Sequence, residues 1–310
     1  THRTEASMRS STSHHVTVRD LRIHVRTWGD PAHPPVLLLH GWMDVSASFQ
    51  FTADAMVSDH YLVAPDWRGF GLSQWATDGY WFPDYLADLD ALLDVFSPGA
   101  PAAVVGHSMG GNIAGLYAGV RPDRVSKLVL AEGFGLKETS PDDAPKRYGR
   151  WLGEQRSVDG FRPYADLDAV AAHLRKTDPG LTEERARFLA PHWSMPGTDG
   201  RFVPAADPRH KWVNPVLYRL EEALACWRRI TAPTLWIWGG DRDWMKRFTG
   251  EDAEEWARRR GAFARLAEVR IEDSGHMMHR DQPERFAAHL EAFLATDRDA
   301  ADAAAAPNAP

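Results

Sequence analysis

Residues 102–119, AAVVGHSMGGNIAGLYAG, place one serine between glycines where a predicted strand meets a predicted helix. The apolar run 102–105 is typical of a buried strand, and small and apolar residues return at helical spacing after Gly111. Between them, residues 106–110 match the pattern G-x-S-x-G, in which the serine occupies a sharp strand-to-helix turn. The glycines on both sides of Ser108 would leave space for such a turn. The pattern alone is weak evidence, so its meaning depends on the rest of the chain.

Apolar runs bounded by turn residues recur along the chain and alternate with helical patterns from residue 36 onward. Continuous apolar strands that alternate with helices predict an α/β fold with a mostly parallel sheet of eight strands. Strands are expected at 15–21, 23–28, 36–40, 61–65, 102–106, 127–131, 234–238 and 268–271, and helices at 47–57, 82–96, 109–120, 251–260 and 283–294.

Residues 134–229 interrupt this alternation with helical segments, long Pro- and Gly-rich connections and no clear strand. Such a stretch is too long for a simple loop, which predicts a helical cap inserted into an α/β core of residues 14–133 and 230–296. Residues 1–13 and 297–310 are expected to be disordered.

The composition of the 310-residue chain excludes several classes of protein. A net charge of -7 argues against a nucleic-acid partner, and no apolar stretch is long enough to span a membrane. The single cysteine, Cys226, excludes an internal disulfide. The N-terminal residues lack the apolar core of a secretory signal, so a cytoplasmic location is expected.

A catalytic serine needs a base, and the base needs an orienting acid. His276 follows a predicted strand and a glycine, which places it at the same sheet edge as Ser108, whereas His279 is the competing candidate nearer the next helix. Asp243 follows the strand 234–238 and is the expected acid. The two other carboxylates at this edge are also candidates: Asp241 is the alternative in the same loop, and Glu132, after the strand 127–131, is the backup acid.

The strand 36–40 ends in His40-Gly41-Trp42, which offers backbone N–H groups at the same edge. Hydrolysis of an acyl group needs two such donors for the tetrahedral oxyanion. The N–H groups of Trp42 and Met109 are the expected pair.

Together these residues resemble the α/β-hydrolase superfamily. His40-Gly41 is similar to the oxyanion loop of this superfamily, and residues 66–73 (DWRGFGLS) are similar to its D-x-R-G-x-G-x-S turn. Residues 106–111 resemble its nucleophile elbow, and Gly275-His276 resembles its histidine loop. The likeness is strongest to capped, serine hydrolase-like members. It implies ester or lactone hydrolysis by Ser108, His276 and an acid through an acyl-enzyme, without a metal or organic cofactor.

The substrate is expected to be a small ester or lactone, with an apolar or aromatic group held by aromatic side chains. The candidate pocket residues are His107, Phe134, Trp151, Trp193, Trp212 and Trp244, although each of the tryptophans and Phe134 also fits a packing role. Two alternatives stay open at this point: hydrolysis of a carbon–carbon bond in a ring-cleavage product, and a non-catalytic ligand-binding module.

Overall fold

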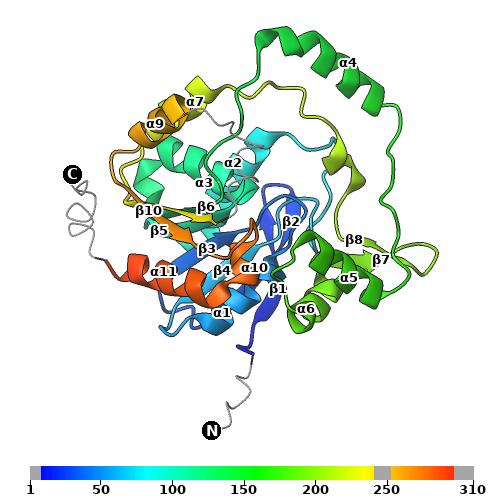
Figure 1. Cartoon of the computed structure of the whole chain (residues 1–310), viewed down its shortest axis with the longest axis horizontal. Helices are drawn as coiled ribbons and strands as arrows, with labels where there is room; N and C mark the ends of the chain where they lie inside the picture. Colours follow the sequence, from blue (N-terminus) through cyan, green and yellow to red (C-terminus); the bar gives the residue numbers. More distant parts are fainter. Residues whose placement is uncertain (1–7, 241–252, 297–310) are drawn as a thin grey trace.

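The computed structural model describes residues 8–240 and 253–296, and its centre is an eight-stranded sheet (Figure 1). The strand order is β1-β2-β4-β3-β5-β6-β9-β10, and all neighbours from β4 onward are parallel, whereas β1, β2 and β4 pair antiparallel. This confirms the expected mostly parallel sheet. The strands are β1 (Thr12–Val18), β2 (Leu21–Trp28), β3 (Pro35–Leu39), β4 (Tyr61–Pro65), β5 (Ala102–His107), β6 (Val125–Ala131), β9 (Thr234–Gly239) and β10 (Leu266–Ile271).

Helices cover both faces of the sheet, and alternate residues of each central strand face them. Leu37 and Leu39 of β3 belong to the core under α2 and α3, whereas Val36 and Leu38 belong to the core under α1 and α11. The continuous apolar pattern of the strands follows from this burial on both faces. The covering helices are α1 (Gln50–Ala55), α2 (Phe82–Phe96), α3 (Met109–Val120), α9 (Ala253–Gly261) and α11 (Pro283–Ala295), with the short α10 (Met278–Asp281) before the last.

The insertion between β6 and β9 has three helices outside the sheet layers, and it also contains a hairpin that the sequence did not predict. The hairpin strands are only three residues long, too short for an alternating pattern to be recognised. The elements are α4 (Ala144–Glu154), α5 (Leu167–Thr177), α6 (Glu183–Trp193), β7 (Ser194–Pro196) and β8 (Phe202–Pro204). Helices α5 and α6 form their own apolar cluster, which includes Val170, Leu189 and the α1 residue Phe51.

The last helix of the insertion, α7 (Leu220–Trp227), packs as part of the core. Its buried residues Leu224 and Trp227 join the same cluster as α2 and α3. Gly119 of α3 meets this helix so closely that a Cβ there would lie 2.0 Å from the carbonyl oxygen of Cys226. The segment expected to be cap therefore returns to the core before β9 begins.

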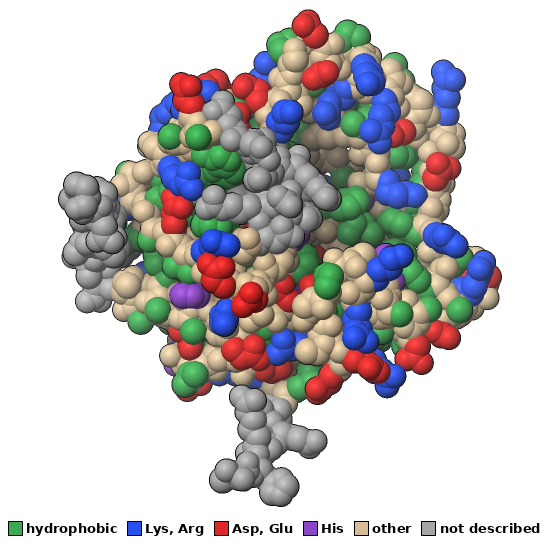
Figure 2. Space-filling view, in the orientation of Figure 1, with side chains coloured by type: hydrophobic (Ala, Val, Ile, Leu, Met, Phe, Trp, Pro, Cys, Tyr) green, Lys and Arg blue, Asp and Glu red, His purple; other side chains and the backbone are tan. Residues whose placement is uncertain are grey.

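Helix α4 stands away from the sheet at the outer end of the insertion (Figure 1), and none of its residues is buried. Below it the surface is hollowed, with Lys and Arg side chains around the hollow and hydrophobic side chains within it (Figure 2). No helix in residues 8–240 and 253–296 is both long and apolar enough to cross a membrane.

We predict that Gly119→Ala destabilises the fold by about 1–3 kcal/mol, because the new methyl group overpacks the contact between α3 and α7. Gly149→Ala in α4 is the matched control: no atom lies within 4 Å of its added Cβ, so it should stabilise by about 0.5–1 kcal/mol through helix propensity. Urea unfolding followed by circular dichroism measures both. Equal effects would show that α7 does not pack on α3 as described.

Candidate active site

Ser108 lies between β5 and α3 in a strained backbone conformation, with φ 51° and ψ −115°. Such a conformation costs about 1–3 kcal/mol and persists only where the surroundings impose it. The neighbouring glycines leave room for this turn. A Cβ on Gly106 would lie 2.4 Å from the carbonyl oxygen of Gly110, and a Cβ on Gly110 would lie 2.2 Å from the carbonyl oxygen of Leu39. The turn therefore presents Ser108 at the carboxyl edge of the sheet, at the N-terminus of α3.

The loop after β3 lies directly against Ser108. A Cβ on Gly41 would be 3.1 Å from the Cβ of Ser108, so only glycine fits without displacement. His40 fixes this loop, because its Nε2 accepts a hydrogen bond from the N–H of Trp67 (2.9 Å) and its Nδ1–H therefore donates to the carbonyl oxygen of Gly41 (2.7 Å). Trp42 follows at once and its side chain is exposed.

His276 lies on the loop between β10 and α10 and is tied to the residue that precedes Ser108. The Nε2–H of His107 donates to the carbonyl oxygen of His276 (2.8 Å), and the two imidazole ring centres are 4.7 Å apart. Asp281 shapes the same loop by accepting hydrogen bonds from the N–H of Gly275 (2.8 Å) and the hydroxyl of Ser274 (2.9 Å). The structure thus brings the serine turn and the histidine loop together, as the sequence predicts.

Glu132 is the described carboxylate that faces His276 across this edge. One of its oxygens, Oε2, lies 3.8 Å from Nδ1 of His276, and the other accepts a hydrogen bond from the N–H of Gly239 (2.6 Å). Glu132 follows β6 directly, is buried, and has a positive φ of 53°, which marks a second strained position at the same edge. The expected acid Asp243, its alternative Asp241 and the pocket candidate Trp244 lie outside the described residues.

Burial keeps His276 neutral. Its pKa is lowered to about 3, mainly by desolvation and then by the nearby His279 and Arg280, against a smaller opposing effect of Asp44. The pKa of His107 is also well below its ordinary value, again because of burial and then because of the two neighbouring imidazoles. Near neutral pH His276 is therefore in the unprotonated form that a general base requires.

A buried polar network lies beside the histidine loop, and it was not predicted from the sequence. Asp44 accepts hydrogen bonds from Ser48 (2.8 Å) and from Nε2 of His279 (3.3 Å), and it lies 3.6 Å from the guanidinium of Arg280. Burial alone would raise the pKa of Asp44, but the hydrogen bond from His279 and the charge of Arg280 outweigh it and lower the pKa. The only available signal was that Asp44 closely follows the strand expected at 36–40.

The same network reaches the insertion. Arg280 donates to Asp178, the residue that directly follows α5, at 3.2 Å, and both side chains are buried. Trp193 of α6 donates its indole N–H to the carbonyl oxygen of Met43 (2.7 Å), on the loop that also carries Gly41. The insertion therefore contacts both loops that surround Ser108.

One group of potential metal ligands occurs among the described residues. Asp44, His107 and His279 place ligand-type atoms within 4.8 Å of one another, and all three are buried. Arg280 already supplies a cation beside Asp44, which opposes the binding of a second one. The expectation that no metal is needed stays a prediction.

The aromatic candidates for a substrate pocket occupy different environments. Phe134 stacks on Trp236 with ring centres 4.3 Å apart and is 1% exposed, so it belongs to the core and not to a pocket wall. His107 is likewise buried behind the serine turn. Trp193 is buried against the loop after β3 and Trp151 is half-buried on α4.

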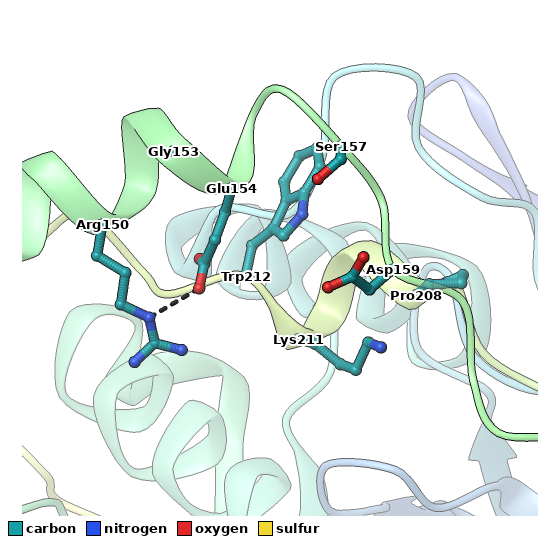
Figure 3. Close-up of a pocket in the computed structure, with 8 residues that line it drawn as sticks. All are labelled: Arg150, Gly153, Glu154, Ser157, Asp159, Pro208, Lys211 and Trp212. Atoms are coloured by element: carbon teal, nitrogen blue, oxygen red, sulfur yellow. Dashed lines mark hydrogen bonds and ion pairs between the residues drawn. The ribbon is translucent and has the colours of Figure 1, made fainter.

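Trp212 lines a pocket of about 480 Å³ between α4 and the turn 208–211 (Figure 3). Around it stand charged side chains of both signs, including the hydrogen-bonded pair Arg150 and Glu154 (2.7 Å). The complete lining is Arg150, Gly153, Glu154, Ser157, Asp159, Pro208, Lys211 and Trp212.

The family model of the alpha/beta hydrolase fold matches residues 34–283, most of the chain. The chain belongs to the alpha/beta-hydrolase family. Within this family it is similar to a serine hydrolase-like protein of Danio rerio, with 26% identity over an alignment that covers 87% of this chain and 84% of that protein. It is also 31% identical, over 82% of this chain and 87% of the relative, to the 3-hydroxybutyrate-oligomer hydrolase of Cupriavidus necator.

Solved structures agree with this assignment of the fold. The thioesterase domain from the curacin biosynthetic pathway superposes with a TM-score of 0.82, at 24% identity, over 91% of this chain and 99% of that domain. This alpha/beta hydrolase is thus a hydrolase of the serine hydrolase-like type, and the resemblance inferred from its motifs is confirmed.

We predict that the protein loses stability as the pH falls from 7.5 to 5. Several buried histidines have lowered pKa values, so between about pH 6.5 and 5 the unfolded chain binds more protons than the native one and unfolding becomes easier. These histidines are His40, His107, His210, His276 and His279. Asp178 acts in the opposite direction, because burial raises its pKa to about 6, but it is one group against these five.

Urea unfolding at pH 7.5, 6.5 and 5.5 checks this prediction. The free energy of unfolding should fall at each step. A constant or rising value would show that these imidazoles are protonated in the native protein.

Proposed function

We propose that this alpha/beta hydrolase cleaves carboxylic esters, lactones included, through an acyl-enzyme on Ser108. The observation that carries the proposal is the strained serine turn, which His107 links by a hydrogen bond to the loop of His276. A serine held in this conformation at a helix N-terminus, close to a neutral imidazole, is the arrangement that nucleophilic catalysis requires.

In the proposed reaction Ser108 attacks the acyl carbon while His276 removes the proton of its hydroxyl group. The N–H groups of Trp42 and Met109 stabilise the oxyanion. The positions of the two residues support this pair. Gly41, which precedes Trp42, lies against Ser108. Met109 is the first residue of α3, and the first N–H groups of a helix have no hydrogen-bond partner within the helix. His276 then protonates the leaving alcohol, and water releases the acid by the same steps.

We propose Glu132 as the group that orients His276. It is buried, it follows the strand next to β5, and its Oε2 lies 3.8 Å from Nδ1 of His276. This distance exceeds a hydrogen bond, but catalytic hydrogen bonds are often long before substrate binds. Asp243 remains the competing acid.

Ser108→Ala should lower kcat for p-nitrophenyl esters by at least about 10³-fold, because the acyl-enzyme cannot form. The melting temperature should not fall, since alanine removes only the hydroxyl group. A fluorophosphonate probe should label the wild-type protein at Ser108 and should fail to label this position in the variant. Absence of labelling in the wild type would support a non-catalytic binding module.

A substrate panel separates the remaining chemistries. It contains p-nitrophenyl esters, lactones, 3-hydroxybutyrate oligomers and a dienoic keto-acid. Turnover of the keto-acid alone would replace ester hydrolysis by cleavage of a carbon–carbon bond.

Glu132→Gln and Asp243→Asn are compared to assign the acid. If Glu132 orients His276, its variant should lose about 10³- to 10⁴-fold in kcat, as expected when the imidazole loses its correct tautomer, whereas the Asp243 variant should lose less than 10-fold. Circular dichroism at the assay temperature controls for folding, because Glu132 also holds the N–H of Gly239. The reverse ranking would assign the role to Asp243.

A further inference from the structure

A Ser-His-Asp arrangement lies in the antiparallel part of the sheet formed by β1, β2 and β4, at the opposite end of the strand order from β10, which precedes the loop of His276. The hydroxyl oxygen of Ser13 on β1 is 2.6 Å from Nε2 of His24 on β2, and Nδ1 of His24 is 2.7 Å from Oδ2 of Asp66, which follows β4. None of these residues belongs to the site described above.

The proton positions in this arrangement follow from Asp66. Burial alone would raise its pKa, but the hydrogen bond and charge of His24 and the N–H of Leu72 lower it to about 2, so Asp66 is ionised. A carboxylate only accepts hydrogen bonds, so His24 donates Nδ1–H to it. With Nδ1–H directed at Asp66, Nε2 is the ring nitrogen that can accept the O–H of Ser13 at 2.6 Å. This is the order of roles found in a serine catalytic triad.

The three residues also differ in exposure in the way that a reactive serine requires. His24 and Asp66 are buried, with 1% and 2% of their surface exposed, whereas Ser13 is exposed. Within the sheet, β1 is the edge strand and pairs only with β2 (Figure 1). The base is thus shielded from water while the hydroxyl group of Ser13 stays accessible.

Arg26 supplies a positive charge on the same face. It is the direct register partner of Ser13 across the antiparallel pair β1–β2, so the two side chains are neighbours. Its guanidinium donates to the hydroxyl of Ser11 (2.9 Å), whereas its buried Nε has no hydrogen-bond partner among the described residues. A guanidinium beside Ser13 favours the negative charge that develops when an oxygen nucleophile attacks an acyl group.

We propose that Ser13 is a second nucleophilic serine, which takes the acyl group of an activated carboxylic ester with His24 as base and Asp66 as the residue that positions His24. The oxygen of Ser13 bonds to the acyl carbon and its proton passes to Nε2 of His24. The bond between the acyl carbon and the leaving oxygen breaks, and the leaving alkoxide takes up this proton. The products are the ester of Ser13 and a free alcohol.

Ser13 lies in a regular strand and not at a strand-to-helix turn with two adjacent N–H donors. We therefore expect its acylation to be about 10²- to 10³-fold slower than that of Ser108.

The test uses the full chain with Ser108→Ala, so that the proposed active-site serine cannot react. The protein is treated with p-nitrophenyl acetate, quenched with acid and digested with trypsin, and the peptide of residues 10–19 is fragmented in a mass spectrometer. We expect acetyl groups on Ser13 in at least tenfold excess over Ser10, which is likewise exposed, and over the half-buried Ser11, which contacts Arg26. Adding Ser13→Ala should abolish the modification, and adding Ser11→Ala should preserve it.

His24→Gln should also abolish the modification, with circular dichroism as the control for folding. The ratio of Ser13 to Ser10, which is also exposed, decides the matter within the Ser108→Ala protein even if the His24 variant does not fold. No acetyl group on Ser13, or equal amounts on Ser10 and Ser13, would overturn the proposal, because exposure alone would then explain the reaction. Labelling of Ser108 by the fluorophosphonate probe in a Ser13→Ala protein tests the proposed function separately.

Discussion

The close approach of backbone around Ser108 is the constraint on which the rest of the site depends. Helix α3 can begin directly after β5 only because Gly106 and Gly110 have no side chains where the turn meets the carbonyl of Leu39. The strain is held by the sheet, since the N–H of Ser108 donates to the carbonyl of Ala131 on the next strand (2.8 Å). Neighbouring strands thus fix one serine in a conformation that an isolated turn would not keep.

Several contacts extend this rigidity to the other parts of the site. His107 holds the loop of His276, His40 holds the loop of Gly41, and Trp193 joins that second loop to the insertion. All three are single side-chain hydrogen bonds to backbone carbonyls. Side chains of the fold therefore position the backbone of the site, which keeps the groups proposed for catalysis in register with Ser108.

The sequence predicted the fold and the serine turn well because both depend on local patterns. The strands buried on both faces are continuously apolar, and the glycines around Ser108 mark the turn. Specific side-chain contacts between distant residues were harder to predict. Glu132 was expected only as the backup acid, because its 3.8 Å approach to His276 depends on the order of strands in the sheet. The hydrogen bond between Asp44 and His279 was not predicted at all. The hairpin β7–β8 was missed because its strands are too short to show a period.

Both ends of the insertion are anchored in the core. Phe134 at its start and Trp227 at its end stack on each other with ring centres 5.4 Å apart, so the chain leaves the core and re-enters it at neighbouring points. Because the two ends of the insertion lie close together, lengthening it adds little to the conformational entropy that is lost on folding. The outer part, with α4, can therefore differ in length and composition between related chains without disturbing the sheet. This arrangement lets the surface around the site change while the turn of Ser108 remains the same.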